Sequence, residues 1–150
     1  MTAAHATAPG GTPVTATTRQ DVRALFERYA ATFATHDVEA IAALHAEDTE
    51  FRLRLDGEPA RGREAVAATF AALFADWPEF GFDVHRVLIG EGHWVLDWAA
   101  TAVLARPDGT PVPVRFDCLD VVTVDGDGLV TRKDTFVDST QLQAALAAAA

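Results

Sequence analysis

The chain has 150 residues and a mass of 16.0 kDa, the size of a single domain that can bury a core without disulfides. Its 22 acidic residues outnumber its 12 basic ones, and the formal charge of −10 argues against binding to nucleic acid or to an anionic membrane surface. Its single cysteine, Cys118, cannot form an intrachain disulfide. The sequence contains neither a run of about 18 apolar residues nor the basic and apolar segments of a secretory signal. We therefore expect a soluble, cytoplasmic protein.

The first 18 residues differ in composition from the rest of the chain. Ala, Thr, Pro and Gly dominate them, and Met1 and Val14 are the only sizeable apolar side chains. Such a segment buries too little surface to offset the entropy lost on ordering. We predict a disordered tail over residues 1–18, which includes His5, and a single domain over residues 19–150.

The pattern of apolar residues predicts four helices and five strands. Helical spacing of apolar side chains marks the helices, and runs rich in Val, Leu and aromatic residues mark the strands. Thr18 with Asp21 resembles a capping pair, and Asp37 is a good N-cap for a short helix whose apolar face includes His45. In chain order, we predict helices over 19–35 and 38–45, a strand over 49–55, a helix over 63–76, strands over 80–90, 93–105, 112–124 and 129–137, and a helix over 139–147.

Tight turns link the last four predicted strands, as at Asp125–Gly128. These strands should form an antiparallel meander with the helices gathered on one face. We predict an α+β fold in which three helices cover a strongly curved, mixed or antiparallel sheet. The sheet should form a cone with an apolar pocket at its open end.

Motifs of several enzyme classes are missing from the sequence. It has no Gly-rich phosphate loop, no Gly-x-Ser-x-Gly elbow and no Cys-x-x-Cys pair. The five histidines lack metal-ligand spacing, so we expect neither a metal nor another cofactor. Cys118 is either a nucleophile or a small core residue, and its apolar strand favours the second interpretation.

Carboxylates inside apolar strands are the most informative polar residues. Asp117 and Asp120 are three residues apart in one predicted strand, so they face opposite sides of the sheet. Asp120 shares its face with Phe116 and Cys118 and is the better candidate for a buried carboxyl. An apolar pocket raises the pKa of a carboxyl, which can then act as a general acid or base, or stay protonated. The alternative is a structural Asp120 that caps a turn or pairs with an arginine.

Four further polar residues allow two interpretations each. Tyr29 lies on the apolar face of the first predicted helix, where it is either a core residue with one hydrogen bond or a donor to a ligand. His45 is either a satisfied interior residue or a catalyst. For Asp97 and Asp134 we favour a structural role, although Asp134 would face the pocket if the last strand were bulged.

Six short segments between residues 19 and 147 carry a family resemblance. They are Arg28-Tyr29, Asp37–Ile41, Ala46–Thr49, Gly62–Glu64, Asp117–Val121 and Gly128. With these segments the chain resembles the nuclear-transport-factor-2-like superfamily, in particular the SnoaL-like polyketide cyclases and the ketosteroid isomerases. The resemblance implies a cystatin-like α+β barrel and a homodimer formed through the exposed sheet face. It is weaker for the reaction, because this fold hosts many chemistries and also non-enzymes.

The match to the ketosteroid isomerases is partial. In those enzymes a helix tyrosine and a protonated strand aspartate hold an enolate oxygen, and the resemblance places Tyr29 and Asp120 at these positions. At the position of their general base this chain has Leu53, and at the positions of two supporting tyrosines it has His45 and Phe70. Plain steroid isomerase activity is therefore not expected.

Epoxide hydrolases of the same fold use an Asp–Arg–Asp set. According to the resemblance, this chain has Ala99 where those enzymes have the Arg, and Thr101 where they have the first Asp. The position of their last Asp falls at or next to Asp134. These residues argue against epoxide hydrolysis by that mechanism. SnoaL-like cyclases need only one acid/base carboxylate in an apolar pocket, a requirement that Asp120 can meet.

Two functional hypotheses follow. In the first, a cofactor-independent acid/base enzyme of cyclase or isomerase type acts on a hydrophobic carbonyl compound. Tyr29 and Asp120 would stabilise an enolate, and His45 or Asp134 would move the proton. In the second, the chain is a non-catalytic module of the same fold that binds a small apolar ligand or dimerises. In both cases we expect the pocket to be lined by Phe26, Leu53, Phe70, Phe74, Trp98, Phe116, Cys118 and Thr135.

Overall fold

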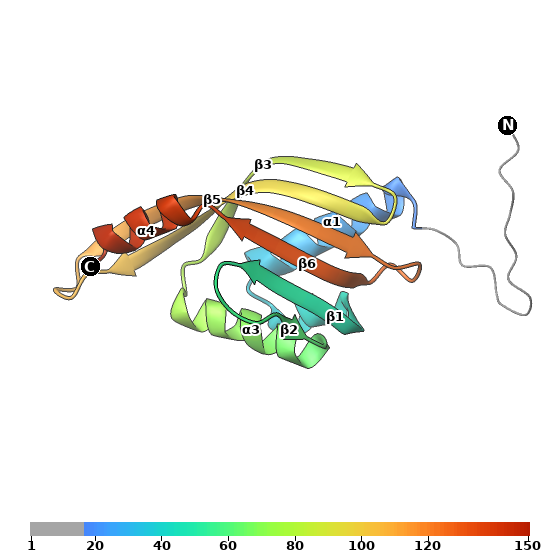
Figure 1. Cartoon of the computed structure of the whole chain (residues 1–150), viewed down its shortest axis with the longest axis horizontal. Coiled ribbons are helices and arrows are strands. Elements are labelled where there is room, and N and C mark those ends of the chain that lie inside the picture. Colours follow the sequence, from blue (N-terminus) through green and yellow to red (C-terminus); the bar gives the residue numbers. More distant parts are fainter. Residues whose placement is uncertain (1–16) are drawn as a thin grey trace, which may run out of the picture.

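The computed structural model describes residues 17–150 (Figure 1). The elements of this range are α1 (Arg19–Ala34), α2 (Val38–Ala43), β1 (His45–Arg54), β2 (Ala60–Arg61), α3 (Arg63–Asp76), β3 (Gly81–Gly90), β4 (His93–Ala105), β5 (Pro111–Val124), β6 (Val130–Val137) and α4 (Ser139–Ala148). All the predicted elements are therefore present, and the two-residue strand β2 is an addition. Residues 1–16 of the predicted tail, with His5, lie outside the described residues.

One six-stranded sheet forms the body of the described chain, in the order β2-β1-β6-β5-β4-β3. Strands β3 to β6 pair as the predicted antiparallel meander, whereas β1 pairs with β6 in parallel. The register shifts between β1 and β6, between β3 and β4, and between β5 and β6. Such irregularities bend and twist strands. The predicted α+β fold with a curved, mixed sheet is confirmed.

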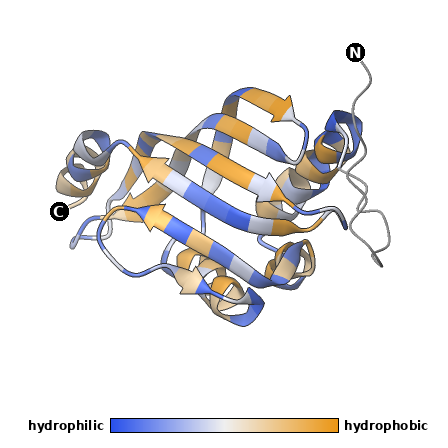
Figure 2. Ribbon diagram, turned by 45° about the vertical axis from the view of Figure 1, so that its right-hand side comes forward, coloured by the Kyte–Doolittle hydropathy of each residue, from blue (hydrophilic) through white to orange (hydrophobic). Residues whose placement is uncertain are grey.

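The two faces of the sheet have different surroundings. Helix α3 packs on β1, and α1 packs on β3 and β4, so these helices cover the inner face (Figure 1). Phe51, Trp98 and Asp120 point to this inner face, whereas Arg52 and Asp134 point to the outer face. Figure 2 shows hydrophobic and hydrophilic residues alternating along the strands, as expected for a sheet with one covered face.

Local hydrogen bonds explain where the first two helices begin. Thr18 and Asp21 form the predicted capping box, and the Asp37 side chain accepts from the Ala40 amide at the start of α2. Thr17, which we assigned to the tail, is buried, and its carbonyl accepts from the Gly92 amide. Thr17 and Thr18, which lie before our predicted boundary, therefore make contacts with the folded part of the described chain.

The start of the first long strand also differs from the prediction. We expected His45 on the apolar face of the second helix, but α2 ends at Ala43 and β1 begins at His45. The chain leaves the helix because the carbonyl of Leu44 accepts from the amide of Val130, which already belongs to β6. Within residues 17–150, no helix has the length and apolar character needed to cross a membrane.

Candidate active site

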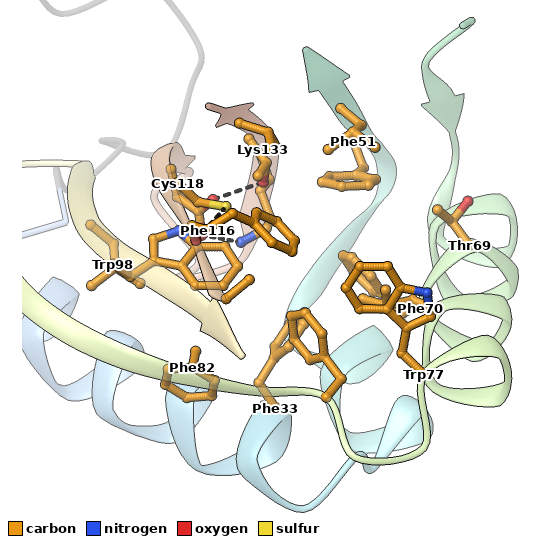
Figure 3. Close-up of a pocket in the computed structure, with 18 of the residues that line it drawn as sticks. Phe33, Phe51, Thr69, Phe70, Trp77, Phe82, Trp98, Phe116, Cys118 and Lys133 are labelled. Atoms are coloured by element: carbon orange, nitrogen blue, oxygen red, sulfur yellow. Dashed lines mark hydrogen bonds and ion pairs between the residues drawn. The ribbon is translucent and has the colours of Figure 1, made fainter. Parts of the chain in front are cut away.

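The inner face of the sheet and helices α1 and α3 enclose a cavity of about 320 Å³ (Figure 3). This volume lies at the lower end of the range found for small-molecule sites. Aromatic and aliphatic side chains make up most of its wall. The residues that we expected in the wall and that do line it are Phe26, Leu53, Phe70, Trp98, Phe116, Cys118 and Thr135.

Phe74 was expected in the wall, but that prediction is wrong. Its ring stacks on the imidazole of His36, with ring centroids 4.2 Å apart. It also packs against Phe33 and Phe80, with centroids 5.7 and 6.2 Å away. These three neighbours enclose Phe74 between the end of α1 and the end of α3, so the ring fills core space.

A buried ion pair lies in the wall of this cavity. The Nζ atom of Lys133 lies 2.5 Å from Oδ2 of Asp120, and the hydroxyl of Thr135 donates to Oδ1 at 2.7 Å. The side chains of Lys133 and Asp120 are only 7% and 3% exposed. Asp117, by contrast, has a side chain that is 55% exposed, so the prediction that Asp120 is the buried member of the two is confirmed.

The pairing of β5 with β6 brings these groups together. Asp120 lies directly opposite Thr135, and Lys133 lies two residues earlier on the same face of β6. We expected Asp120 to be a general acid or base or a protonated hydrogen-bond donor, or else a structural residue that caps a turn or pairs with an arginine. The structure instead pairs it with Lys133, which sequence reasoning did not identify as a site residue. The hairpin turn at Asp125–Gly128 predicts that β5 and β6 pair. The register shifts by one residue between Thr123 and Val124, however, and this irregularity decides that residues 133 and 135 share the face of Asp120.

Aromatic rings surround the ammonium group of Lys133. Its Nζ atom lies 5.4 Å from the ring centroid of Tyr29 and 5.3 Å from that of Phe33, within the range of cation–π attraction. An ammonium group has three N–H donors, of which Asp120 takes one. Lys133 can therefore hold Asp120 and still donate to a ligand oxygen.

Tyr29, His45 and Thr49 form a hydrogen-bonded chain beside the ion pair. The Tyr29 hydroxyl is 2.9 Å from Nε2 of His45, and Nδ1 of His45 is 2.9 Å from the hydroxyl of Thr49. Burial, and then the charges of Lys133 and Arg63, lower the pKa of His45 to about 3, so its ring is neutral at pH 7. A neutral ring has one N–H, so either Tyr29 or His45 donates in the first of these bonds.

The position of His45 does not fit the proton-moving role that we expected. The ring is fully buried and contacts Tyr29 rather than the cavity. A pKa of about 3 also makes it a weak proton acceptor at neutral pH. Burial and the charge of Asp120 raise the pKa of Tyr29 well above its usual value, so this hydroxyl keeps its proton.

Asp134 does not join the cavity, so the expectation that it can replace Asp120 there is wrong. Because side chains alternate along β6, Lys133 and Thr135 point inward and Asp134 points to the outer face. There its carboxylate lies 2.6 Å from Nε of Arg132 and 3.0 Å from a terminal nitrogen of Arg54. The hydrogen bond from Arg132 lowers the pKa of Asp134.

Cys118 lines the cavity but has the character of a core residue. Its side chain is buried next to Asp120 on the same strand. Burial, and then the charge of Asp120, raise the pKa of its thiol to about 12. Because the thiolate is the reactive form, this thiol is a poor nucleophile at neutral pH.

Comparisons with known proteins agree on the fold. Residues 26–133 match the SnoaL-like domain family. A protein from Shewanella denitrificans, assigned as a SnoaL-like polyketide cyclase, has a similar structure at 13% identity and a TM-score of 0.74, over 85% of this chain and 97% of that one. A protein from Kribbella flavida, assigned as a ketosteroid isomerase, is similar at 25% identity and a TM-score of 0.63, over 79% and 78%.

A third similar structure is that of SalBIII, an epoxide hydrolase/cyclase-like enzyme with a role in pyran ring formation in the polyether salinomycin. It is 19% identical, with a TM-score of 0.70, over 81% of this chain and 94% of that one. No curated protein matches the chain significantly. The chain belongs to the SnoaL-like domain family, and its fold is related to those of polyketide cyclases and ketosteroid isomerases.

Proposed function

We propose that this protein is a cofactor-independent acid/base enzyme of cyclase or isomerase type. It acts on a hydrophobic small molecule that contains a carbonyl group, and the reaction passes through an enolate. The observation that carries this proposal is the buried Asp120–Lys133 pair in the wall of a largely apolar cavity. Apolar walls select a hydrophobic ligand, and the pair supplies a proton acceptor and a cation where water is displaced.

In this proposal, Asp120 is the base and Lys133 stabilises the enolate. A carboxylate oxygen of Asp120 removes a proton from the carbon next to the carbonyl, and the electron pair moves onto the carbonyl oxygen. The ammonium of Lys133, which keeps donors that Asp120 does not use, holds this oxygen. The enolate then takes the proton back from Asp120 at a conjugated carbon. Alternatively it attacks a second carbonyl carbon of the same molecule to close a ring, and the alkoxide oxygen formed there takes the proton from Asp120.

This assignment changes the role of Tyr29. We expected its hydroxyl to hold the enolate oxygen, but that hydroxyl is bonded to His45, and Lys133 lies over the Tyr29 ring. Tyr29 therefore supports the ammonium with its aromatic face. Its hydrogen bond to His45 fixes the ring in place.

The test is deuterium exchange at the carbon next to a carbonyl, followed by NMR in D₂O with 2-tetralone as the probe. We expect the protein to accelerate exchange, and Asp120→Asn and Lys133→Met to lose about 100-fold of that acceleration. Asp134→Asn is the matched control, because it removes another buried, ion-paired carboxylate, from the outer face. No acceleration by the wild type, or full acceleration by Asp120→Asn that circular dichroism shows to be folded, would refute the proposal.

A non-catalytic binding module is the second candidate, and one observation favours it. Both oxygens of Asp120 already have protein partners, Lys133 and Thr135, so the carboxylate is satisfied without a ligand. In that case 2-tetralone would bind without any acceleration of exchange. The same experiment therefore separates the two candidates.

We also propose that the chain forms a homodimer through the outer face of the sheet. Apolar side chains are exposed there, with Leu88 at 54%, Leu119 at 37% and Phe136 at 42%. Leu119 and Phe136 are direct neighbours across β5 and β6, so they form a continuous apolar patch. Burial of such a patch stabilises association.

A further inference from the structure

Lys133 is the single lysine of the chain, and it lies in the wall of the cavity. Of the 12 basic residues in the sequence, the other 11 are arginines. Within residues 17–150, every other ion pair that joins a carboxylate to a lysine or arginine uses arginine, as between Arg54 and Asp134. An arginine can also bind a carboxylate with two parallel hydrogen bonds. Charge pairing alone therefore does not explain why the partner of Asp120 is a lysine.

The property that separates lysine from arginine is that its amine can lose a proton. A guanidinium stays protonated in proteins, whereas a neutral amine carries a lone pair that attacks a carbonyl carbon. Nζ of Lys133 lies 2.5 Å from Oδ2 of Asp120, so one proton transfer along this hydrogen bond gives a neutral amine and a neutral acid. A ligand that fills the cavity displaces water from the pair, and the loss of water disfavours charged forms relative to neutral ones.

The amine lies among groups that all border the cavity. In Figure 3 the Lys133 side chain points in between the aromatic rings of the wall. Its Nζ atom contacts Asp120 by a hydrogen bond and the rings of Tyr29 and Phe33 by cation–π attraction, and all three residues line the same cavity. The two rings attract an iminium cation as they attract the ammonium. The cavity thus brings together a nucleophile, a proton carrier and a wall that stabilises a cation.

We infer that Lys133 forms a covalent imine with an aldehyde or ketone bound in the cavity, and that Asp120 moves the protons of this reaction. The inference rests on the proposed function, because the same carbonyl group is bound, and it adds a nucleophilic role for Lys133. The ammonium that holds a carbonyl oxygen and the amine that attacks the carbonyl carbon are two protonation states of one group. The substrate class is a hydrophobic compound with an unhindered aldehyde or ketone group.

The reaction conserves atoms and charge. Asp120 takes one proton from the ammonium, and the nitrogen then bonds to the carbonyl carbon while the π electrons move to the oxygen. That oxygen takes the proton from Asp120, which next removes a second proton from the nitrogen. Asp120 gives this proton to the new hydroxyl group, the C–O bond breaks and water leaves. The product is an iminium cation beside the Asp120 carboxylate. Where the adjacent carbon carries a hydrogen, its loss to Asp120 gives an enamine in place of the enolate.

Hydride trapping tests the inference, because cyanoborohydride reduces an imine to a stable amine. The probes are benzaldehyde and 2-naphthaldehyde, which carry no hydrogen on the carbon next to the carbonyl and so cannot enolise. Each adduct adds the mass of the aldehyde minus one oxygen atom, and peptide mass spectrometry locates it. In native protein at pH 7, position 133 should react about 10-fold faster than the α-amino group of the chain. In urea the order should reverse, because an ordinary lysine is more fully protonated than an α-amino group.

The matched control is Arg54→Lys, which places a second amine beside a buried carboxylate, that of Asp134, on the outer face of the sheet. The adduct should form at position 133 and not at position 54. Tetralin, which has no carbonyl group, should suppress the adduct at position 133 because it occupies the cavity. The inference would be overturned if neither aldehyde reacted at position 133, if both positions reacted equally, or if tetralin left the adduct unchanged.

These outcomes separate the inference from the proposed function. If the protein accelerates deuterium exchange in 2-tetralone but no adduct forms at position 133, the acid/base function stands and the imine fails. If the adduct forms at position 133 but exchange is never accelerated, Lys133 is a nucleophile and the enolate reaction fails.

Discussion

Folding should lose stability between pH 7 and pH 5 because His45 is buried as a neutral imidazole. Burial, and then the charges of Lys133 and Arg63, lower its pKa from 6.5 to about 3. Below about pH 6.5 the unfolded chain therefore binds a proton that the folded chain does not, and the equilibrium shifts toward unfolding. This loss grows as the pH falls and ends near pH 3, where the folded state binds the proton too.

The expected loss follows from the two pKa values of His45. At pH 5 the unfolded imidazole is almost fully protonated while the folded one is neutral, and linkage gives a loss of about 2 kcal/mol relative to pH 7. A small domain has only about 5–15 kcal/mol of stability in total, so this effect is large enough to measure. The hydrogen bond from Arg132 lowers the pKa of Asp134, so the stability that this carboxylate contributes is lost only below pH 5, outside the range compared here.

The assay is urea unfolding at pH 7 and pH 5 for wild type, His45→Gln and His93→Gln. His93 is exposed, so its variant is the matched control and should lose about 2 kcal/mol as the wild type does. His45→Gln should start less stable at pH 7, because the bonds to Tyr29 and Thr49 are disturbed, but should change little at pH 5. An equal loss in wild type and His45→Gln would refute the reasoning.

Three further predictions concern the ion pair, the thiol and the outer face. Lys133→Met should destabilise the fold by about 3–5 kcal/mol in urea unfolding, because it leaves a buried charge without a partner. The double variant with Asp120→Leu should regain most of this loss, and a double variant as unstable as the single one would contradict the assignment. At pH 8 the Cys118 thiol, whose pKa rises from 9.0 to about 12, should react about 1000-fold more slowly with a disulfide reagent in native protein than in urea; a difference below tenfold would count against its burial. Sedimentation should show a dimer that Phe136→Glu dissociates and Leu146→Glu, an equally exposed substitution on α4, does not; a wild-type monomer would end the dimer proposal.

Periodic patterns account for the parts of the fold that were predictable. Helix α3 and strand β4 have the predicted bounds, because each carries an unbroken apolar pattern between clear turn residues. The buried position of Asp120 was predictable for the same reason, since a strand alternates its faces. The structural role that we favoured for Asp97 agrees with its ion pair to Arg86 on the outer face.

Contacts between distant segments account for the rest. The end of α2 depends on a hydrogen bond from the Val130 amide to the Leu44 carbonyl, and the burial of Phe74 depends on the rings of Phe33 and Phe80. No local pattern contains this information. Lys133 is a similar case. The turn at Asp125–Gly128 predicts the pairing of β5 with β6, but the one-residue register shift after Thr123 decides that Lys133, and not Asp134, shares the face of Asp120.

The parallel pairing of β1 with β6 has a consequence for synthesis on the ribosome. Glu50 pairs with Arg132, so the long neighbour of β1 is made only after α3 and strands β2 to β5. Until β6 emerges, β1 has only the two-residue β2 beside it, and β5 is an open edge. The nascent chain can form its first three helices early, but it can close the sheet, and with it the wall that carries Lys133, only after β6 has been translated. A chain that stopped before Val130 would therefore expose two strand edges to aggregation.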